Sequence, residues 1–136
     1  MLNGVLLAKL EALDRVLLEL KSLGRLTTQR LNEDWRTLRA VERDLQVAVE
    51  TVVDVCHRIV ALAGHTPPAT GREVVDRCVQ LGALSGADPY RKMDQFRNIV
   101  VHHYERVDPE ILVDLVNNRL EDFEQFRREI LAYARR

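Results

Sequence analysis

The side chains of this chain that are equipped for chemistry gather in residues 97–104, whose sequence is RNIVVHHY. Arginine is a permanent cation whose planar fork of N–H groups grips phosphate. Histidine titrates near neutral pH and moves protons to and from a reacting group. Arg97 and His102 are therefore the minimum set of side chains for metal-free cleavage of a phosphodiester.

Random placement of residues accounts for the Arg-x4-His spacing alone but not for the full four-residue pattern. In a chain of this composition the spacing Arg-x4-His is expected about 0.5 times at random, so it carries almost no information. Requiring Asn directly after the Arg and Tyr two residues after the His lowers the expectation to about 0.0004. The full pattern of Arg97, Asn98, His102 and Tyr104 is therefore specific, although its parts are not.

A structural interpretation of the same residues stays open at this point. An Arg and an Asn on an exposed helix face often make surface hydrogen bonds only, and a His-x-Tyr at a helix end can simply cap and pack. For His57 and His65 the structural interpretation is preferred, because neither shares a metal-site spacing with Asp, Glu or Cys. We expect no metal site and no cofactor.

Length and composition indicate one domain over residues 1–136 that stays in the cytoplasm. Apolar residues make up 46% and charged residues 30%, with few aromatics, Gly and Pro, which is typical of a soluble helical protein. Residues 1–23 are interrupted by charges too often for a signal peptide or a membrane span. Cys56 and Cys78 lie in apolar stripes and suit a reducing compartment as core residues. The formal charge of −1 means that any contact with RNA must be local.

Apolar residues recur at spacings of three and four through most of the chain, which predicts helices and no strand. The predicted fold is an all-α antiparallel bundle of four main helices and one short helix. The extra apolar residues of the first helix favour a contact with a second subunit, and a homodimer is expected. The helices are predicted from about Leu2 to Leu23, from Leu38 to Leu62, from a Thr70-x-x-Glu73 capping box to Leu81, from Asp88-Pro89 through residues 97–104, and from Asp108-Pro109 to the C-terminus, with residues 25–33 as a polar link.

A helical wheel separates the two adjacent histidines. Arg97, Asn98 and His102 share one arc, on the side predicted to face solvent or another subunit. Phe96, Ile99, Val100 and His103 fall on the apolar side of the same wheel. We therefore choose His102 for chemistry and assign His103 to packing.

Residues 97–104 resemble the Arg-Asn-x-x-x-His-x-Tyr signature of HepT-like proteins, a branch of the HEPN superfamily that pairs with a minimal nucleotidyltransferase. Residues 40–46 (AVERDLQ), the turn at 68–73 and the run 96–108 also resemble that family in order and spacing. The resemblance covers roughly residues 6–132. His103 occupies a variable position of the signature, which leaves open which of the two rings faces the site.

The resemblance implies a fold and a set of roles. Members of the family are all-α bundles that usually form homodimers, with the signature helices of two subunits facing across a cleft. Arg97 and His102 would be the catalytic residues of a metal-independent ribonuclease, and Asn98 would support the Arg or a phosphate oxygen. Tyr104 would support the site and would also be the residue that the partner enzyme modifies with AMP.

The expected function is that of an endoribonuclease toxin in a toxin–antitoxin system. Its partners would be single-stranded RNA as substrate and a cognate minimal nucleotidyltransferase that neutralises it, with no membrane and no DNA. The alternative is a non-catalytic binding or regulatory subunit of the nucleotidyltransferase, which the near-neutral charge favours slightly. A purely structural helical adaptor is disfavoured by the improbability of the full pattern.

Overall fold

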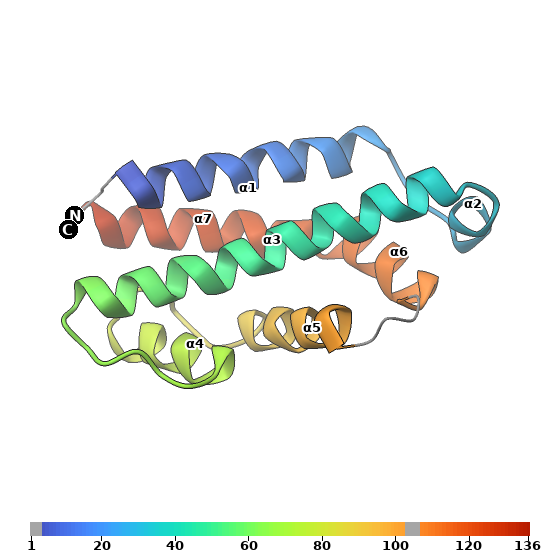
Figure 1. The fold of residues 1–136 in the computed structure, drawn as a ribbon. Helices are drawn as coiled ribbons and strands as arrows, with labels where there is room; N and C mark the ends of the chain where they lie inside the picture. The colour runs from blue at the N-terminus through green and yellow to red at the C-terminus, as the bar shows by residue number, and fades with distance from the viewer. Residues whose placement is uncertain (1–3, 103–106) are drawn as a thin grey trace.

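The structure is a computed structural model that describes residues 4–102 and 107–136, and the side chains of residues 4–99 and 107–136. Within these residues the chain forms seven helices and no strand, which confirms the all-α fold class. The long helices run antiparallel, with the start of α1 and the end of α7 at one end of the bundle (Figure 1). The helices are α1 (Gly4–Ser22), α2 (Thr28–Glu33), α3 (Trp35–Leu62), α4 (Gly71–Gln80), α5 (Tyr90–His102), α6 (Pro109–Asn118) and α7 (Leu120–Ala134).

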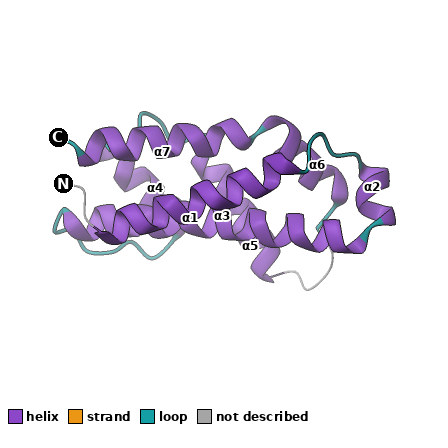
Figure 2. Ribbon diagram, turned by 90° about the horizontal axis from the view of Figure 1, so that it is seen from above, coloured by secondary structure: helices purple, strands orange, loops and turns teal. Residues whose placement is uncertain are grey.

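Helix α3 is the central element of the bundle. It contacts each of the other six helices along its 28 residues. Its buried positions form two adjacent stripes, so much of its circumference is covered. In Figure 1, α1 and α7 lie on one side of α3 and α5 on the other, and in the view from above in Figure 2, α1 overlaps α3. The prediction of one long enclosed helix is confirmed.

Capping residues fix most helix boundaries. The Thr70 hydroxyl accepts a hydrogen bond from the Glu73 N–H at 3.1 Å, as the predicted capping box requires at the start of α4. The Asp108 carboxylate accepts one from the Glu110 N–H at 2.9 Å at the start of α6. Gly24 follows α1 with a φ of +69°, a backbone conformation that favours glycine. Helix α5 begins at Tyr90, directly after Pro89.

The predicted polar link over residues 25–33 is wrong in part, because it contains helix α2. The Thr27 hydroxyl accepts a hydrogen bond from the Arg30 N–H at 3.1 Å and caps this helix. Leu26 and Leu31 are buried, so the segment is anchored by two apolar side chains. Six helical residues are too few for a periodic pattern to emerge, which is why the sequence did not indicate them.

The C-terminal helix is also divided where a continuous one was predicted. Helix α6 ends at Asn118 and α7 starts at Leu120. The Asn117 amide donates to the Leu26 carbonyl and accepts from the Leu26 N–H, both at 2.9 Å. This pair of bonds fixes the last turn of α6 to a segment 91 residues away in sequence. The division therefore depends on a tertiary contact that the local sequence does not encode.

Helix α1 carries apolar residues on more than its buried stripe. Leu7 and Leu18 are exposed, whereas Val16 is buried against the core. The exposed pair is the feature that suggested a second subunit, and the homodimer stays a prediction. No helix among residues 4–102 and 107–136 combines the length and the apolar character needed to cross a membrane.

The carboxyl group of Asp44 in α3 interacts with that of Glu19 in α1. Burial of Asp44 and its hydrogen bond with Glu19 raise the pKa of Asp44 from 3.8 to about 6. Because the folded-state pKa is raised, this group's contribution to stability is fully present below about pH 3.8 and is lost as the pH rises through about 6. At neutral pH the folded protein therefore holds an unfavourable pair of carboxylates.

Replacing Asp44 with Asn should stabilise the protein at neutral pH. We expect the free energy of unfolding to rise by about 1 kcal/mol at about pH 7.5, after allowance for solvent screening, and to change little at about pH 4. Denaturant unfolding at the two pH values measures the difference. Glu19→Gln is the matched control and should give a smaller pH-dependent gain, because the burial of Asp44, the largest cause of its raised pKa, remains. An equal effect of Asp44→Asn at both pH values would contradict the assignment.

Candidate active site

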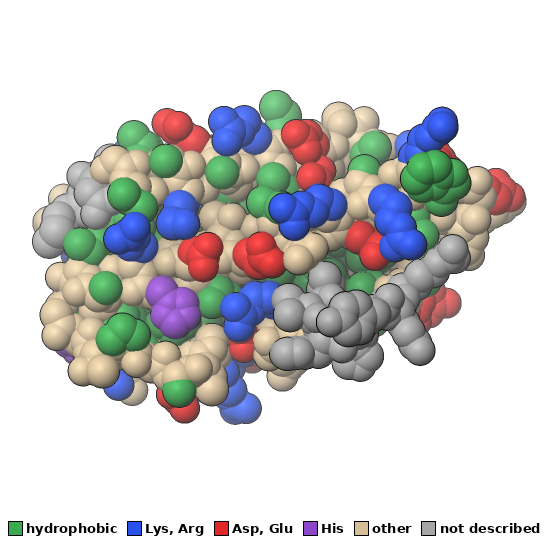
Figure 3. All heavy atoms as spheres, in the orientation of Figure 1, with side chains coloured by type: hydrophobic (Ala, Val, Ile, Leu, Met, Phe, Trp, Pro, Cys, Tyr) green, Lys and Arg blue, Asp and Glu red, His purple; other side chains and the backbone are tan. Residues whose placement is uncertain are grey.

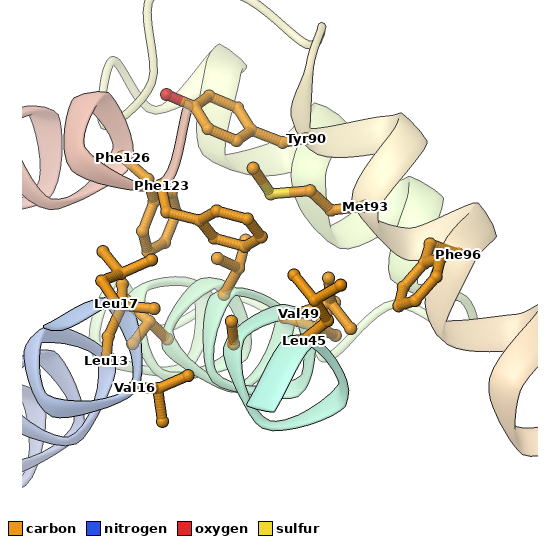
Figure 4. Packing of buried hydrophobic residues seen from close by; sticks show 14 of the residues in the cluster. Leu13, Val16, Leu17, Leu45, Val49, Tyr90, Met93, Phe96, Phe123 and Phe126 are labelled. Carbon is orange, nitrogen blue, oxygen red and sulfur yellow. The ribbon is translucent and has the colours of Figure 1, made fainter. Parts of the chain in front are cut away.

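The helix that carries Arg97 is anchored firmly at its first half. Tyr90, Met93 and Phe96 are buried on the inner side of α5 and point toward α3 and α7 in Figure 4. The Tyr90 hydroxyl donates a hydrogen bond of 2.5 Å to Glu129, and its ring meets Phe126 edge-on at a centroid distance of 5.4 Å. These contacts fix both the position and the rotation of α5.

The hydrogen bond between Tyr90 and Glu129 joins a neutral hydroxyl to a carboxylate. Burial, with a further contribution from the hydrogen bond to Glu129, raises the pKa of Tyr90 well above its ordinary value, so the hydroxyl stays a neutral donor. Burial alone would raise the pKa of Glu129, but hydrogen bonds from Ser85 and Tyr90 outweigh it and lower the pKa. The pair is therefore a neutral donor facing a carboxylate.

Arg97 is less exposed than the helical wheel predicted. Its side chain is 30% exposed, and its position falls in the middle of the buried arc of α5, between Phe96 on one side and Asp94 on the other. The prediction that Arg97 shares an open face with Asn98 holds only in part, because the buried residues Tyr90 and Asp94 widen the packed side of the helix toward Arg97. Arg97 is thus half-buried and still reaches solvent.

Asp94 is the nearest charged partner of Arg97. Arg97 Nη2 lies 3.2 Å from Asp94 Oδ1, and the Asp94 residue is only 4% exposed. Neither Asp94 Oδ1 nor Arg97 Nε has a hydrogen-bond partner among the described residues. The two side chains therefore form an ion pair in which Asp94 Oδ1 accepts no hydrogen bond. Sequence reasoning missed Asp94, although its spacing of three residues from Arg97 on a helix was an available signal.

A glycine on the neighbouring helix makes room for the Asp94 carboxylate. Gly71, the first residue of α4, is buried, and a Cβ atom added there would lie 2.7 Å from Asp94 Cγ. Real Cβ atoms do not approach that closely. The positive end of the α4 dipole lies at the same place and favours the negative charge of Asp94. Arg97 is therefore tied through Asp94 to the start of α4.

The other predicted site residues are described to different extents. Asn98 is exposed, as predicted, and Ile99 is 40% exposed rather than on the packed side. His102 is the last residue of α5, about 140° around the helix axis from Arg97 and about 7.5 Å along it. The side chain of His102, and all of His103 and Tyr104, lie outside the described residues.

Other reactive side chains give no second site of this kind. Among the described residues no group of three or more His, Cys, Asp or Glu side chains is placed to hold a metal ion. Cys56 and Cys78 are free thiols buried in the core, as predicted. On the face drawn in Figure 3 acidic and basic side chains alternate, so the visible surface has no large patch of one charge.

Comparison with known proteins places the chain in a family. The sequence profile of the ribonuclease HepT-like family matches residues 13–130. The mRNA nuclease HepT of Shewanella oneidensis is 26% identical over 127 residues, which cover 92% of this chain and 95% of the relative. The chain belongs to the ribonuclease HepT-like family, which confirms the predicted resemblance.

Solved structures agree with this assignment. A tri-AMPylated HEPN toxin of Shewanella oneidensis, in complex with an MNT antitoxin, superposes with a TM-score of 0.85 at 26% identity, covering 96% of this chain and 99% of the other. A toxin–antitoxin complex with AMP-PNP superposes with a TM-score of 0.83 at 25% identity, covering 95% of this chain and 99% of the other. The similarity thus extends over nearly the whole bundle and includes the helix that carries Arg97.

Gly71→Ala should destabilise the protein because its methyl group overlaps the Asp94 carboxylate. We expect a loss of about 1–3 kcal/mol in the free energy of unfolding, measured by denaturant titration. Gly86→Ala is the matched control, since a Cβ there meets no atom within 4 Å. The cost of Gly71→Ala should shrink when Asp94 is also replaced with Ala. An undiminished cost in that double variant would show that the strain arises elsewhere.

Proposed function

We propose that this member of the HepT-like family is the endoribonuclease toxin of a toxin–antitoxin pair. The observation that carries the proposal is the family match over residues 13–130, which includes the complete Arg-Asn-x-x-x-His-x-Tyr signature. The geometry of Arg97 supports it, because a half-buried guanidinium that reaches solvent interacts with a phosphate more strongly than a fully hydrated one.

The proposed reaction is transesterification at a ribose 2′-hydroxyl and needs no metal ion. His102 accepts the proton of the 2′-hydroxyl or donates one to the leaving 5′-oxygen. Arg97 donates N–H groups to the phosphate oxygens, on which negative charge develops in the transition state. The products are a 2′,3′-cyclic phosphate and a 5′-hydroxyl. Because DNA lacks the nucleophilic 2′-hydroxyl, it is not cleaved.

Two copies of the chain complete the proposed site. The positions of Arg97 and His102 lie about 140° apart on one straight helix, so a single α5 does not readily direct both side chains at one phosphate. Two α5 helices that face each other across a cleft bring Arg97 of one copy near His102 of the other. The exposed Ile99 and Asn98 lie on the sector of α5 that such a partner would cover.

Cleavage of a DNA oligonucleotide that contains one ribonucleotide tests the chemistry directly. We expect the purified protein in EDTA to cut it only 3′ of the ribonucleotide and to leave an all-DNA control intact. Arg97→Ala and His102→Ala should lower the rate by about 10²- to 10⁴-fold. His65→Ala and Arg128→Ala, which alter exposed residues outside the signature, should leave the rate unchanged.

Three outcomes would contradict this assignment. Cleavage that survives both Arg97→Ala and His102→Ala would place the active site elsewhere. Cleavage of the all-DNA control would exclude attack by a 2′-hydroxyl. Intact substrate throughout, together with a tight complex with the nucleotidyltransferase, would favour the non-catalytic partner function, to which the formal charge of −1 also lends some support.

The proposed antitoxin is a minimal nucleotidyltransferase that transfers AMP from ATP to the Tyr104 phenol and releases pyrophosphate. A bulky anion on this residue of the signature would compete with the RNA phosphate for Arg97 and repel RNA, by the same physics as phosphorylation. With radiolabelled ATP and the partner enzyme, we expect label on the wild-type chain and on Tyr133→Phe but none on Tyr104→Phe. Labelled wild-type protein should lose cleavage activity. Labelling of Tyr104→Phe equal to the wild type would assign the modification to another residue.

A further inference from the structure

Helix α5 carries two arginines that are paired with buried or half-buried carboxylates in different ways. Arg91 donates from both Nε and Nη2 to Asp76 Oδ1 of α4, with a distance of 2.8 Å for the Nε bond. Arg97 approaches Asp94 Oδ1 to 3.2 Å through Nη2, but neither this oxygen nor the buried Nε of Arg97 has a hydrogen-bond partner among the described residues. The Arg91 guanidinium is thus held by two hydrogen bonds, whereas that of Arg97 is held by an ion pair.

The difference leaves Arg97 with unused donors. An arginine carries five N–H groups in a fixed plane, and a carboxylate that binds the fork leaves few of them for another ligand. Asp76 binds Arg91 in this way and joins α4 to α5. Asp94 forms an ion pair with Arg97 in which its Oδ1 accepts no hydrogen bond from a described residue, so this oxygen does not take up the N–H groups of the guanidinium.

The Asp94 carboxylate itself cannot move far. Its residue is 4% exposed, and its oxygens are packed against Gly71 at the start of α4. A buried carboxylate is costly unless a positive charge compensates it. Here Arg97 and the positive end of the α4 dipole provide that compensation. The carboxylate is therefore a fixed point from which the guanidinium extends.

We propose that Asp94 is a positioning residue that holds Arg97 through this ion pair, so that the guanidinium N–H groups that reach solvent face the phosphate of the RNA substrate. This inference rests on the proposed ribonuclease function. Asp94 does not touch the substrate. It fixes the guanidinium in the orientation needed when charge develops on the phosphate oxygens. The space that the Asp94 carboxylate fills exists only because residue 71 is glycine.

The variant Asp94→Asn tests the proposal because it keeps the shape of the side chain and removes its charge. We expect kcat for the single-ribonucleotide substrate to fall by about 10- to 100-fold, as a misplaced catalytic group predicts. KM should stay constant or decrease, because a negative charge near the bound phosphate is removed. Asp76→Asn is the matched control, since it also removes one carboxylate partner of an α5 arginine, and its kcat should equal that of the wild type.

A double-mutant cycle separates positioning from a general effect on folding. If Asp94 acts through Arg97, Asp94→Asn should cause no additional loss of kcat in an Arg97→Lys background, where the fork is absent. If Asp94→Asn acted through a general effect on the fold, it would lower kcat by the same factor in the Arg97→Lys background as in the wild type. Thermal unfolding of every variant checks that the folded fraction at the assay temperature is the same.

A second measurement detects the ion pair between Arg97 and Asp94 without relying on catalysis. The NMR signal of the Arg97 Nε–Hε group should shift and broaden in Asp94→Asn and stay in place in Asp76→Asn. An unchanged signal or an unchanged kcat in Asp94→Asn, with an active wild type, would overturn the inference alone. A wild-type protein that cleaves no RNA would overturn the proposed function, and with it the catalytic role of Asp94, whatever the NMR signal shows.

Discussion

The anchoring of α5 against α3 and α7 is the constraint on which the site depends. Tyr90, Met93 and Phe96 are buried along the inner side of α5, and the hydrogen bond from Tyr90 to Glu129 prevents that side from rotating. Because the helix is rigid, this rotation decides which residues of the signature are packed and which are open. Arg97 is half-buried for this reason, and Asn98, one residue further, is exposed.

Much of the fold followed from local signals in the sequence. Thr70 and Asp108 are side-chain caps whose partners lie within three residues, so the sequence alone indicates them. The helices start where these caps predict. The break between α6 and α7 was missed because it depends on the bonds between Asn117 and Leu26, which only the folded chain brings together.

The sequence identified the residues of the candidate site but not how they are oriented around helix α5. A wheel that counts only apolar residues places Ile99 inside and Arg97 outside, whereas in the structure Ile99 is 40% exposed and the Arg97 side chain 30%. The error arises because Tyr90 and Asp94 are polar in type and buried in fact. Asp94 is tolerated there through a cation on its own helix and a glycine on the next, a combination that spacing along one helix does not reveal.

The pairing of Arg97 with Asp94 also bears on how a protein of formal charge −1 would act on RNA. A guanidinium whose charge is partly balanced by a fixed carboxylate produces little long-range field, so it attracts a distant RNA weakly. On the proposed function the balance changes at contact, because N–H groups of Arg97 that are not hydrogen-bonded to Asp94 Oδ1 would meet a phosphate whose negative charge grows in the transition state. On the proposed function, Arg97 therefore stabilises the transition state more than the bound substrate, which is the condition for raising kcat.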